Sequence, residues 1–227
     1  MKNICLDTNT IISHIFLSEP YHSIIKNYMR KNMKSEYYYT ESILTETENI
    51  YYQKHNLILN IFNDFTDFLE DYHNKFLLNN NIITKFVLEN HDYYYKGKKV
   101  SKRYIETILY EFLKEICEDN IDGFDAFKRF ERYLTKMSSQ LFNHKENFYK
   151  KLTLIPKHSK EYPTITNTLT KNGSHYEDNE IILDIYEYVL INNIKFTIVT
   201  FDKSFYNSLK KCKFNFINNI IGILDLK

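Results

Sequence analysis

Four acidic residues, far apart in the sequence, each stand where an expected strand ends or a helix begins. Asp7 directly follows the apolar run NICL, and Asp202 follows TIVTF. Glu46 lies in TESILTE, after a tyrosine-rich run, and Asp178 opens the helical pattern DNEIILDIYEYVLI. In open parallel sheets, ligands bind beyond the carboxyl ends of the strands, where loops and helix N-termini meet. We therefore expect the four acids to gather at one edge of one sheet.

Carboxylates gathered in this way need a cation. Like charges held close together repel and raise one another's pKa unless positive charge binds between them. Oxygen ligands without His or Cys companions favour a hard divalent cation, so we expect Mg²⁺ or Mn²⁺. Carboxylate-bound Mg²⁺ can activate a water for in-line attack on a phosphate and stabilise the leaving oxygen. The chemistry that this set of residues predicts is phosphodiester hydrolysis.

Each acid also has an ordinary structural explanation. Asp7 could cap a helix, and an aspartate in a first helical turn, such as Asp178, complements the helix dipole. Glu46 shares one helical stripe with Ile43 and Ile50, which would turn its carboxylate inward. A competing stripe leaves Glu46 in water and consists of Leu44, Thr47 and Tyr51. Asp184 points away from the face of Asp178 and is not assigned to the site.

A sheet is needed to position these acids. The expected strands are 3–6, 37–39, a segment in KFTIVTFD and a segment in KFNFINNIIGILDL, and a helical pattern covers 21–29. Strands that alternate with helices in this order predict an α/β fold with a central parallel sheet. Residues 156–173 are polar and are expected to form a loop. His158 and His175 in and after this loop are not assigned to the site.

The middle of the chain follows a different pattern. Apolar residues keep a helical period from Leu57 to Phe76, and the period returns in 104–116 and 124–148. Heptads are not sustained, so a coiled coil is not expected. We expect a core of residues 1–52 and 176–227, interrupted by a helical insertion and connecting loop over 53–175.

Composition restricts the class of protein. With 4 Gly and 3 Pro in 227 residues, the chain is expected to be rich in helix. The formal net charge of +1 gives no global signal for nucleic acid. Cys5, Cys117 and Cys212 are far apart and are expected to be reduced thiols in a cytoplasmic protein. No segment approaches the roughly 20 apolar residues of a membrane span, and no signal peptide is visible.

Taken together, the four acidic motifs resemble those of PIN-domain nucleases. The matching segments are LDTNTII, TESILTE, HYEDNEII and IVTFDKSF. The resemblance implies a Rossmann-like PIN fold and metal-dependent endonuclease activity, usually on single-stranded RNA. It implies that the catalytic metal ligands are Asp7, Glu46, Asp178 and Asp202. Asn9 and Thr200 match small polar residues that commonly support the acids in this family.

The resemblance leaves one choice and several alternatives open. Glu177 competes with Asp178, which is preferred because Ile181 and Ile182 follow it with the usual spacing. A PIN-like scaffold without activity, binding RNA or protein, is the main alternative. The toxin of a toxin–antitoxin pair, with an antitoxin-like partner, is another, and a homodimer is compatible with each. A haloacid-dehalogenase-type phosphatase would need an aspartate at Asn9, and a nucleotide-binding Rossmann enzyme would need a glycine-rich loop.

One basic stretch lies in the expected insertion. The segment YYYKGKKVSKRY interleaves lysines and an arginine with tyrosines. Such residues can neutralise phosphates and stack unpaired bases. The residues that we expect to bind RNA in this way are Lys98, Lys99, Lys102 and Arg103. The alternative interpretation is a solvated loop between two helices.

Overall fold

The computed structural model describes residues 2–70, 80–90, 92–116 and 123–226. The chain divides into two compact units. The sheet unit consists of Met1–Ile50 and His144–Lys227, and the helical unit of Tyr51–Asn143. The second boundary differs from the expected one, because residues 144–175 contribute a strand and a helix to the sheet unit.

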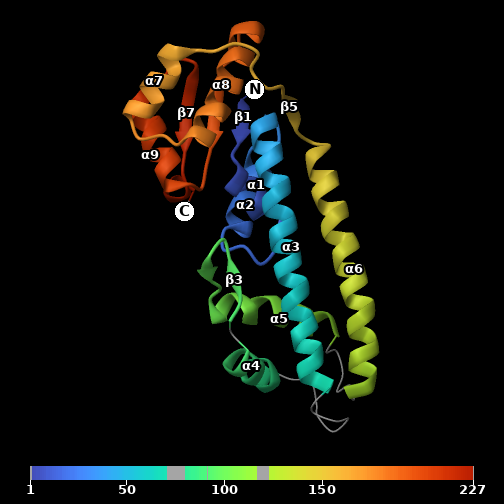
Figure 1. Ribbon diagram of the computed structural model, residues 1–227. Helices are drawn as coiled ribbons and strands as arrows, with labels where there is room; N and C mark the ends of the chain where they lie inside the picture. Colours follow the sequence, from blue (N-terminus) through green and yellow to red (C-terminus); the bar gives the residue numbers. More distant parts are fainter. Residues whose placement is uncertain (1, 71–79, 91, 117–122, 227) are drawn as a thin grey trace. The chain divides into compact units, whose positions relative to one another are not determined.

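The sheet unit is built on parallel strands (Figure 1). Among the described residues they form one five-stranded sheet in the order β5-β2-β1-β6-β7. The strands are β1 (Asn3–Leu6), β2 (Glu36–Thr40), β5 (Thr153–Ile155), β6 (Phe196–Val199) and β7 (Ile217–Ile221). This arrangement confirms the expected α/β class and is compatible with a Rossmann-like fold. The four predicted strands are confirmed, whereas β5 was not predicted because it is short and two of its three residues are exposed.

The central strands are buried on both faces. Ile4, Cys5 and Leu6 of β1 are at most 1% exposed, and every residue of β6 is buried. Such strands read as short continuous apolar runs rather than alternating patterns. Because parallel crossovers are right-handed, the connections on the two sides of β1 run over opposite faces of the sheet.

The helices of the sheet unit form two groups in Figure 1. Helix α1 packs against α2, and α7 packs against α8 and α9. Their bounds are α1 (Thr8–Ile15), α2 (His22–Lys31), α7 (Pro163–Lys171), α8 (Tyr176–Asn192) and α9 (Lys203–Cys212), followed by a short 3₁₀ helix, η1 (Ile223–Asp225). Helix α7 corrects the expected loop over 156–173. Pro163 stands at its start, where proline has no N–H to leave unpaired, and Leu169 is buried.

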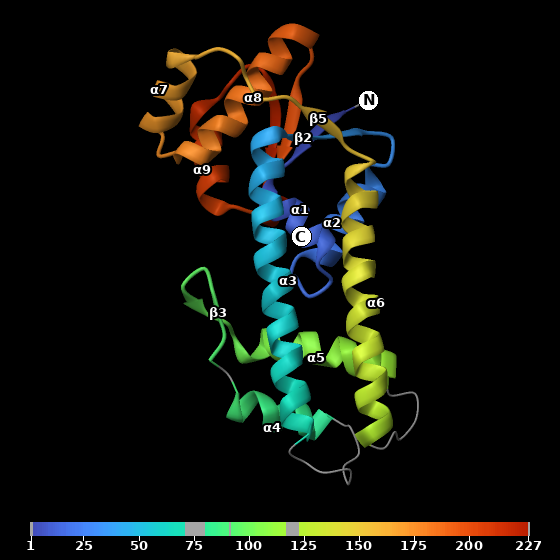
Figure 2. The same cartoon turned by 45° about the vertical axis from the view of Figure 1, so that its right-hand side comes forward.

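The helical unit contains α4 (Asn80–Glu89), α5 (Lys102–Ile116) and parts of two long helices. These are α3 (Glu41–Glu70) and α6 (Gly123–Tyr149), which lie side by side in Figures 1 and 2. Within the unit, the Phe62 and Tyr133 rings are 6.0 Å apart, and His55 Nε2 lies 3.1 Å from Ser138 Oγ. The predicted helical pattern from Leu57 is confirmed as far as Glu70, and its remainder lies outside the described residues.

A β-hairpin within the helical unit carries the basic stretch. Strand β3 (Tyr94–Tyr95) pairs antiparallel with β4 (Lys98–Lys99). The connecting residues Lys96 and Gly97 have φ of 49° and 71°. Positive φ at both central residues is typical of a type I′ turn, and glycine adopts it without steric cost.

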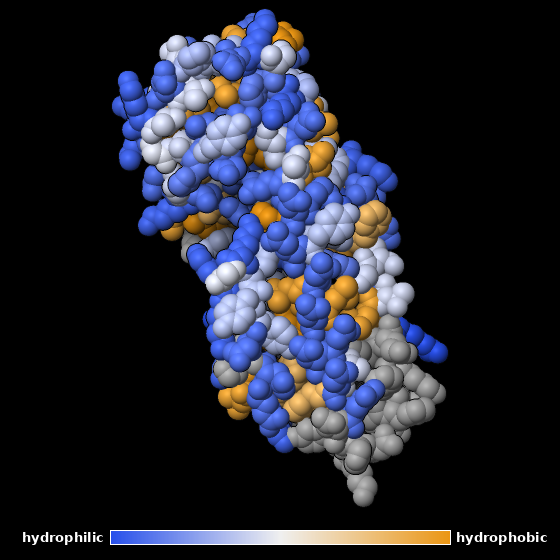
Figure 3. Space-filling model, in the orientation of Figure 1, coloured by the Kyte–Doolittle hydropathy of each residue, from blue (hydrophilic) through white to orange (hydrophobic). Residues whose placement is uncertain are grey.

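The surface is largely polar on the face seen in Figure 3, with hydrophobic side chains in scattered groups. None of the helices in the described ranges combines the length and the apolar character of a membrane span. Cys5 and Cys212 are free thiols, and Cys117 lies outside the described residues.

Candidate functional site

The strand order places two acids at a reversal of the chain's direction across the sheet. Strand β1 lies between β2, the next strand in the chain, and β6. At such a point the loops beyond the two strands diverge and leave a crevice, which is where ligands bind in this class of fold. Asp7 follows β1 directly, and its N–H donates to Val199 O at 3.0 Å, at the end of β6. Asp202 lies just beyond β6, at the start of α9.

Asp7 occupies the N-cap position of α1 but does not use its side chain as a cap. Its backbone is extended, with φ −74° and ψ 161°, and its carboxylate accepts no capping hydrogen bond. Instead, Thr200 Oγ1 donates to Asp7 Oδ2 at 2.7 Å. The residue is 4% exposed. Its carboxylate is therefore buried and held by Thr200, the residue directly after β6.

The pKa of Asp7 reflects this burial. The pKa is raised to about 7, chiefly by desolvation and also by the charges of Glu46 and Asp178, while the hydrogen bond from Thr200 opposes the rise. Carboxyls are neutral when removed from water unless a cation offsets their charge. At neutral pH, Asp7 is therefore poised between its protonated and ionised forms.

Glu46 lies at the margin of the buried face of α3. Ile43 and Ile50 are buried, as the first expected stripe requires, but Thr47 and Tyr51 of the competing stripe are buried as well. Glu46 itself is half-buried. Thr8 Oγ1 donates to Glu46 Oε2 at 2.6 Å, which ties α1 to α3 at the site.

The start of α3 is capped by a threonine side chain. Ile43 N–H donates to Thr40 Oγ1 at 3.2 Å, so Thr40 caps the helix that carries Glu46.

Asp178 fits the site better than its neighbour Glu177. It is half-buried in the first turn of α8, whereas Glu177 is exposed. Burial and the charge of Asp202 raise the pKa of Asp178 to about 6, and Glu46 adds to the rise. The carboxyl of Asp178 therefore lies within electrostatic reach of the other acids.

Asp202 has two structural partners. Its Oδ1 accepts from Phe205 N–H at 2.9 Å and so caps α9. Its own N–H donates to Thr200 Oγ1 at 3.0 Å. One hydroxyl, that of Thr200, thus connects the backbone of Asp202 with the carboxylate of Asp7.

The four acids are mutually coupled without forming a closed cage. The charges of Glu46 and Asp178 act on Asp7, and those of Asp202 and Glu46 act on Asp178. In the ranges that the structure describes, no three His, Cys, Asp or Glu side chains are grouped closely enough to hold a metal ion as they stand. The donors are carboxylates with hydroxyls beside them, which fit Mg²⁺ or Mn²⁺. The charge of such a cation would offset the burial and the carboxylate repulsion that raise the pKa values of Asp7 and Asp178.

The remaining predicted residues differ in their surroundings. Asn9 is exposed in the first turn of α1. The side chains that donate hydrogen bonds to Glu46 and Asp7 are those of Thr8 and Thr200. Thr8 was not predicted, although its place directly after Asp7 was a usable signal. A hydroxyl next to a strand-end acid lies within reach of the same crevice.

The basic residues expected to bind RNA belong to the helical unit. All four are exposed, on β4 and the first turn of α5: Lys98, Lys99, Lys102 and Arg103. Lys99 Nζ lies 2.5 Å from an Asp92 carboxylate oxygen, so part of its charge is neutralised.

The tyrosines around this hairpin differ in their availability for stacking. Tyr93 is buried and donates its hydroxyl to Asp64 Oδ2 at 2.8 Å. The ammonium of Lys54 lies 4.8 Å from the ring centroid of Tyr95. Tyr94 is 62% exposed and is the best placed of these three to stack on a base.

Asp184, which the sequence analysis left out of the site, has a clear structural role. It is fully buried in α8 and accepts from Ser42 Oγ at 2.8 Å. Its other oxygen contacts His158, through N–H at 2.9 Å and Nδ1 at 2.8 Å. Asp184 thereby ties α3 and the 157–162 segment to α8. The signal was present in the sequence, because an acid within the apolar run IILDI needs buried partners.

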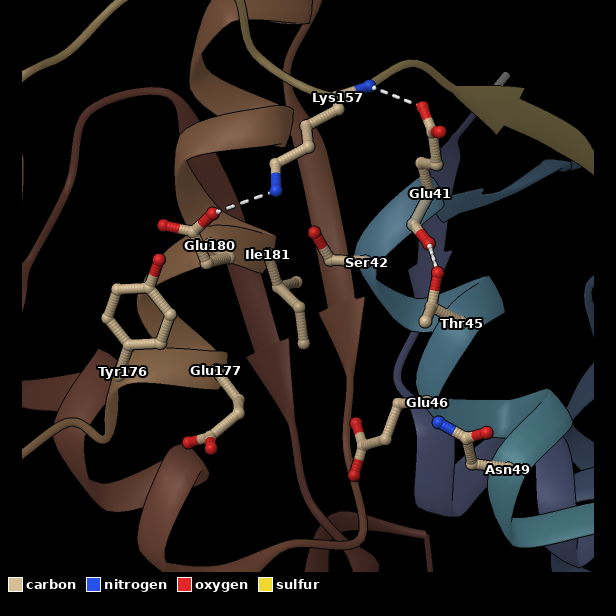
Figure 4. A pocket seen from close by; sticks show the side chains of 10 residues that line it. All are labelled: Glu41, Ser42, Thr45, Glu46, Asn49, Lys157, Tyr176, Glu177, Glu180 and Ile181. Carbon is tan, nitrogen blue, oxygen red and sulfur yellow. Dashed lines mark hydrogen bonds and ion pairs between the residues drawn. The ribbon is translucent and has the colours of Figure 1, made fainter.

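A pocket of about 470 Å³ opens between α3 and α8 within the sheet unit (Figure 4). We call it the α3–α8 pocket. It shares Glu46 with the four acids. Its lining residues are Glu41, Ser42, Thr45, Glu46, Asn49, Lys157, Tyr176, Glu177, Glu180 and Ile181.

Comparisons with known proteins identify no relative. No protein-family model matches the chain, and no curated protein or solved structure is significantly similar to it. The resemblance to PIN domains therefore rests on the four sequence motifs alone.

Proposed function

We propose that this protein is a PIN-like, divalent-metal-dependent endoribonuclease that hydrolyses single-stranded RNA. The observation that carries the proposal is the placement of Asp7. Its buried carboxylate lies at the point where the strand order reverses and makes no helix cap. The charges of Glu46 and Asp178 raise its pKa. A buried acid with these neighbours costs folding free energy. That cost supports a functional role for the residue.

The residues that would hold the metal are the four acids. Asp7, Glu46, Asp178 and Asp202 supply oxygen ligands from four segments of the sheet unit. A bound Mg²⁺ or Mn²⁺ supplies Lewis-acid activation of water and charge stabilisation at the phosphate.

The chain's own hydroxyls orient these ligands. Thr200 holds Asp7 at 2.7 Å, and Thr8 holds Glu46 at 2.6 Å. Two buried threonines therefore restrict the rotation of two carboxylates before any ligand binds. Asp7 must also lose its proton to become a ligand, because metal ligands bind in the deprotonated form. This links activity to a pH near the raised pKa of Asp7.

The basic hairpin is proposed to bind the RNA backbone. Lys98, Lys102 and Arg103 are exposed cations, and Tyr94 is an exposed ring beside them. Phosphate contacts by such cations are independent of base sequence and sensitive to salt.

The experiment that tests the proposal is metal-dependent cleavage of a mixed pool of single-stranded RNAs. Asp7→Asn should keep the fold, shown by an unchanged circular dichroism spectrum, and lose cleavage in Mg²⁺ and in Mn²⁺. A matched control is Asp67→Asn, an exposed aspartate on α3 in the helical unit, which should cleave like the unchanged protein.

Two results would refute the nuclease proposal. One is cleavage by Asp7→Asn at the wild-type rate. The other is an unchanged protein that neither cleaves RNA or DNA nor binds Mn²⁺. RNA binding without cleavage or Mn²⁺ binding would instead support the inactive scaffold.

A further inference from the structure

The α3–α8 pocket has a charged end and an end shared with the candidate site. At the charged end, Lys157 Nζ lies 3.5 Å from Glu180 Oε2. Lys157 also donates its backbone N–H to Glu41 Oε2 at 3.1 Å. Both glutamates are therefore engaged with Lys157, which crosses from one wall to the other in Figure 4. The pocket at this end therefore carries two carboxylates and one ammonium, so its negative charge is partly offset.

At the other end, the pocket meets the four acids. Glu46 extends from α3 toward α8, and Glu177 lies on the opposite wall. Asn49 lines the pocket next to Glu46, one turn further along α3. A ligand placed here lies beside the carboxylates that are proposed to hold the metal.

Tyr176 supplies a flat apolar surface on the α8 wall. It is 72% exposed, although it lines the pocket at the first residue of the helix. A tyrosine so exposed adds little to the core, so packing does not account for it. An exposed aromatic ring in the wall of a pocket offers a face on which an unpaired base can stack.

We propose that the α3–α8 pocket binds one unpaired nucleobase of the RNA, next to the phosphate that is cleaved, and that it prefers bases with an amino group. The proposal rests on the proposed nuclease function. A volume of about 470 Å³ lies within the range of small-ligand sites and accommodates a nucleoside. The base stacks on Tyr176, and its edge faces Glu177, Glu46 and Asn49.

The preference follows from the hydrogen-bonding chemistry of the lining. Ionised carboxylates accept hydrogen bonds and cannot donate them. Adenine, cytosine and guanine carry exocyclic amino donors, and glutamate is a known acceptor for the amino group of cytosine. Uracil has a single N–H donor on its pairing edge, and the two carbonyl oxygens that flank it are disfavoured by the carboxylates. Cytosine, adenine and guanine are therefore expected to bind more tightly than uracil.

The test measures binding rather than cleavage, so that it does not depend on turnover. Short oligouridine with one central position changed to A, C or G is titrated into the Asp7→Asn protein and followed by fluorescence anisotropy. The expected result is an affinity about 10-fold higher for the changed oligonucleotides than for oligouridine itself. If the variant does not fold, the same titration is made with the unchanged protein in EDTA, which prevents metal-dependent cleavage.

Variants of the pocket identify the residues responsible. Tyr176→Ala should weaken the binding of all four oligonucleotides, while Tyr176→Phe should not, because stacking needs the ring and not the hydroxyl. Glu177→Gln should narrow the difference between uracil and the other bases, since an amide can donate to a carbonyl.

Three results would overturn the base-pocket proposal. They are equal affinity for all four oligonucleotides, unchanged affinity in Tyr176→Ala, or no binding of any oligonucleotide. An arginine-rich peptide that binds through Tyr176 while RNA does not would also overturn it and assign the pocket to a protein partner. Failure of the nuclease proposal is recognised separately, by the lack of metal-dependent cleavage in the unchanged protein.

Discussion

At the scale of single residues, Thr200 organises the candidate site. Its hydroxyl donates to Asp7 Oδ2 and accepts from Asp202 N–H, at 2.7 and 3.0 Å. Thr200 is fully buried, so both hydrogen bonds form away from water. A hydroxyl is needed because it must donate and accept at the same time.

Asp7→Asn is expected to stabilise the protein in the absence of metal. The pKa of Asp7 is about 7 in the folded protein, above its ordinary value. A carboxyl with a raised pKa favours folding most at low pH, and this contribution is lost as the pH rises toward the folded pKa. In EDTA, the advantage of Asp7→Asn in unfolding free energy should therefore grow by about 2 kcal/mol between about pH 5 and about pH 8.

Urea unfolding at the two pH values measures this difference. Adding Mn²⁺ should reverse the order, because a ligand that binds only the folded unchanged protein stabilises it. A variant less stable than the unchanged protein at the higher pH in EDTA would contradict the burial argument.

Thr200→Val is expected to shift metal binding to higher pH. In the unchanged protein, the hydrogen bond from Thr200 lowers the pKa of Asp7. Valine cannot form this bond, so the substitution should raise that pKa further. Cleavage near neutral pH should fall about 10-fold, and stability by about 1–2 kcal/mol, because Asp202 N–H loses its acceptor. Mn²⁺ titration across pH tests the shift, and Thr200→Ser, which keeps the hydroxyl, should behave like the unchanged protein.

At the scale of elements, the segment before α7 holds two helices together. Asp184 on α8 accepts hydrogen bonds from Ser42 on α3 and from His158. Further along α8, Glu187 accepts from Ser159 and from Tyr162, at 3.0 and 2.8 Å. These bonds connect the first turn of α3 and the segment before α7 to the middle of α8.

Asp184→Ala is expected to destabilise the sheet unit by about 2–4 kcal/mol, since it removes a fully buried acceptor from the half-buried donors of Ser42 and His158. Thermal or urea unfolding gives the value. Glu187→Gln is the matched control, since its carboxylate lies at the surface and a smaller loss is expected. Equal losses from the two variants would show that burial of Asp184 is not the cause.

At the scale of the whole molecule, charge is distributed locally rather than globally. The net charge of +1 is the sum of opposite local charges, which include an acidic site in the sheet unit and a basic hairpin in the helical unit. Each unit therefore has its own electrostatic character, and RNA binding and metal binding should respond to different substitutions.

Reversing the charge of Lys98 and Lys102 to glutamate tests this separation. RNA binding should weaken, and its dependence on log salt should fall by about 1.4, the contribution of two phosphate contacts on a single strand. Mn²⁺ affinity should be unchanged. The control is the double reversal of Lys31 and Lys34, exposed residues of the sheet unit, which alters the net charge equally. Equal effects of the two double variants on RNA binding would contradict the proposed role of the hairpin and support the alternative, a solvated loop that does not bind RNA.

The sequence alone determined the local elements and the positions of the acids. Short apolar or aromatic runs specify β1, β2 and β6, because strands covered on both faces need continuous apolar residues. The acids follow from the same reasoning, since they stand directly after those runs or in the first turns of helices. Residues 153–155 carried too little apolar pattern to show as a strand, and their pairing with β2 makes them one.

The tertiary structure decided which of these residues meet. The sequence shows that Asp7 begins a helix, but only the β1–β6 pairing shows that its carboxylate is held by Thr200, 193 positions away. It also decided that Asp184 is an anchor, that Tyr94 is exposed while Tyr93 is buried, and that Tyr176 borders a pocket. The physical reason is that burial and hydrogen-bond partners depend on contacts between distant segments, whereas local propensity and periodicity record the neighbours of a residue along its own helix or strand.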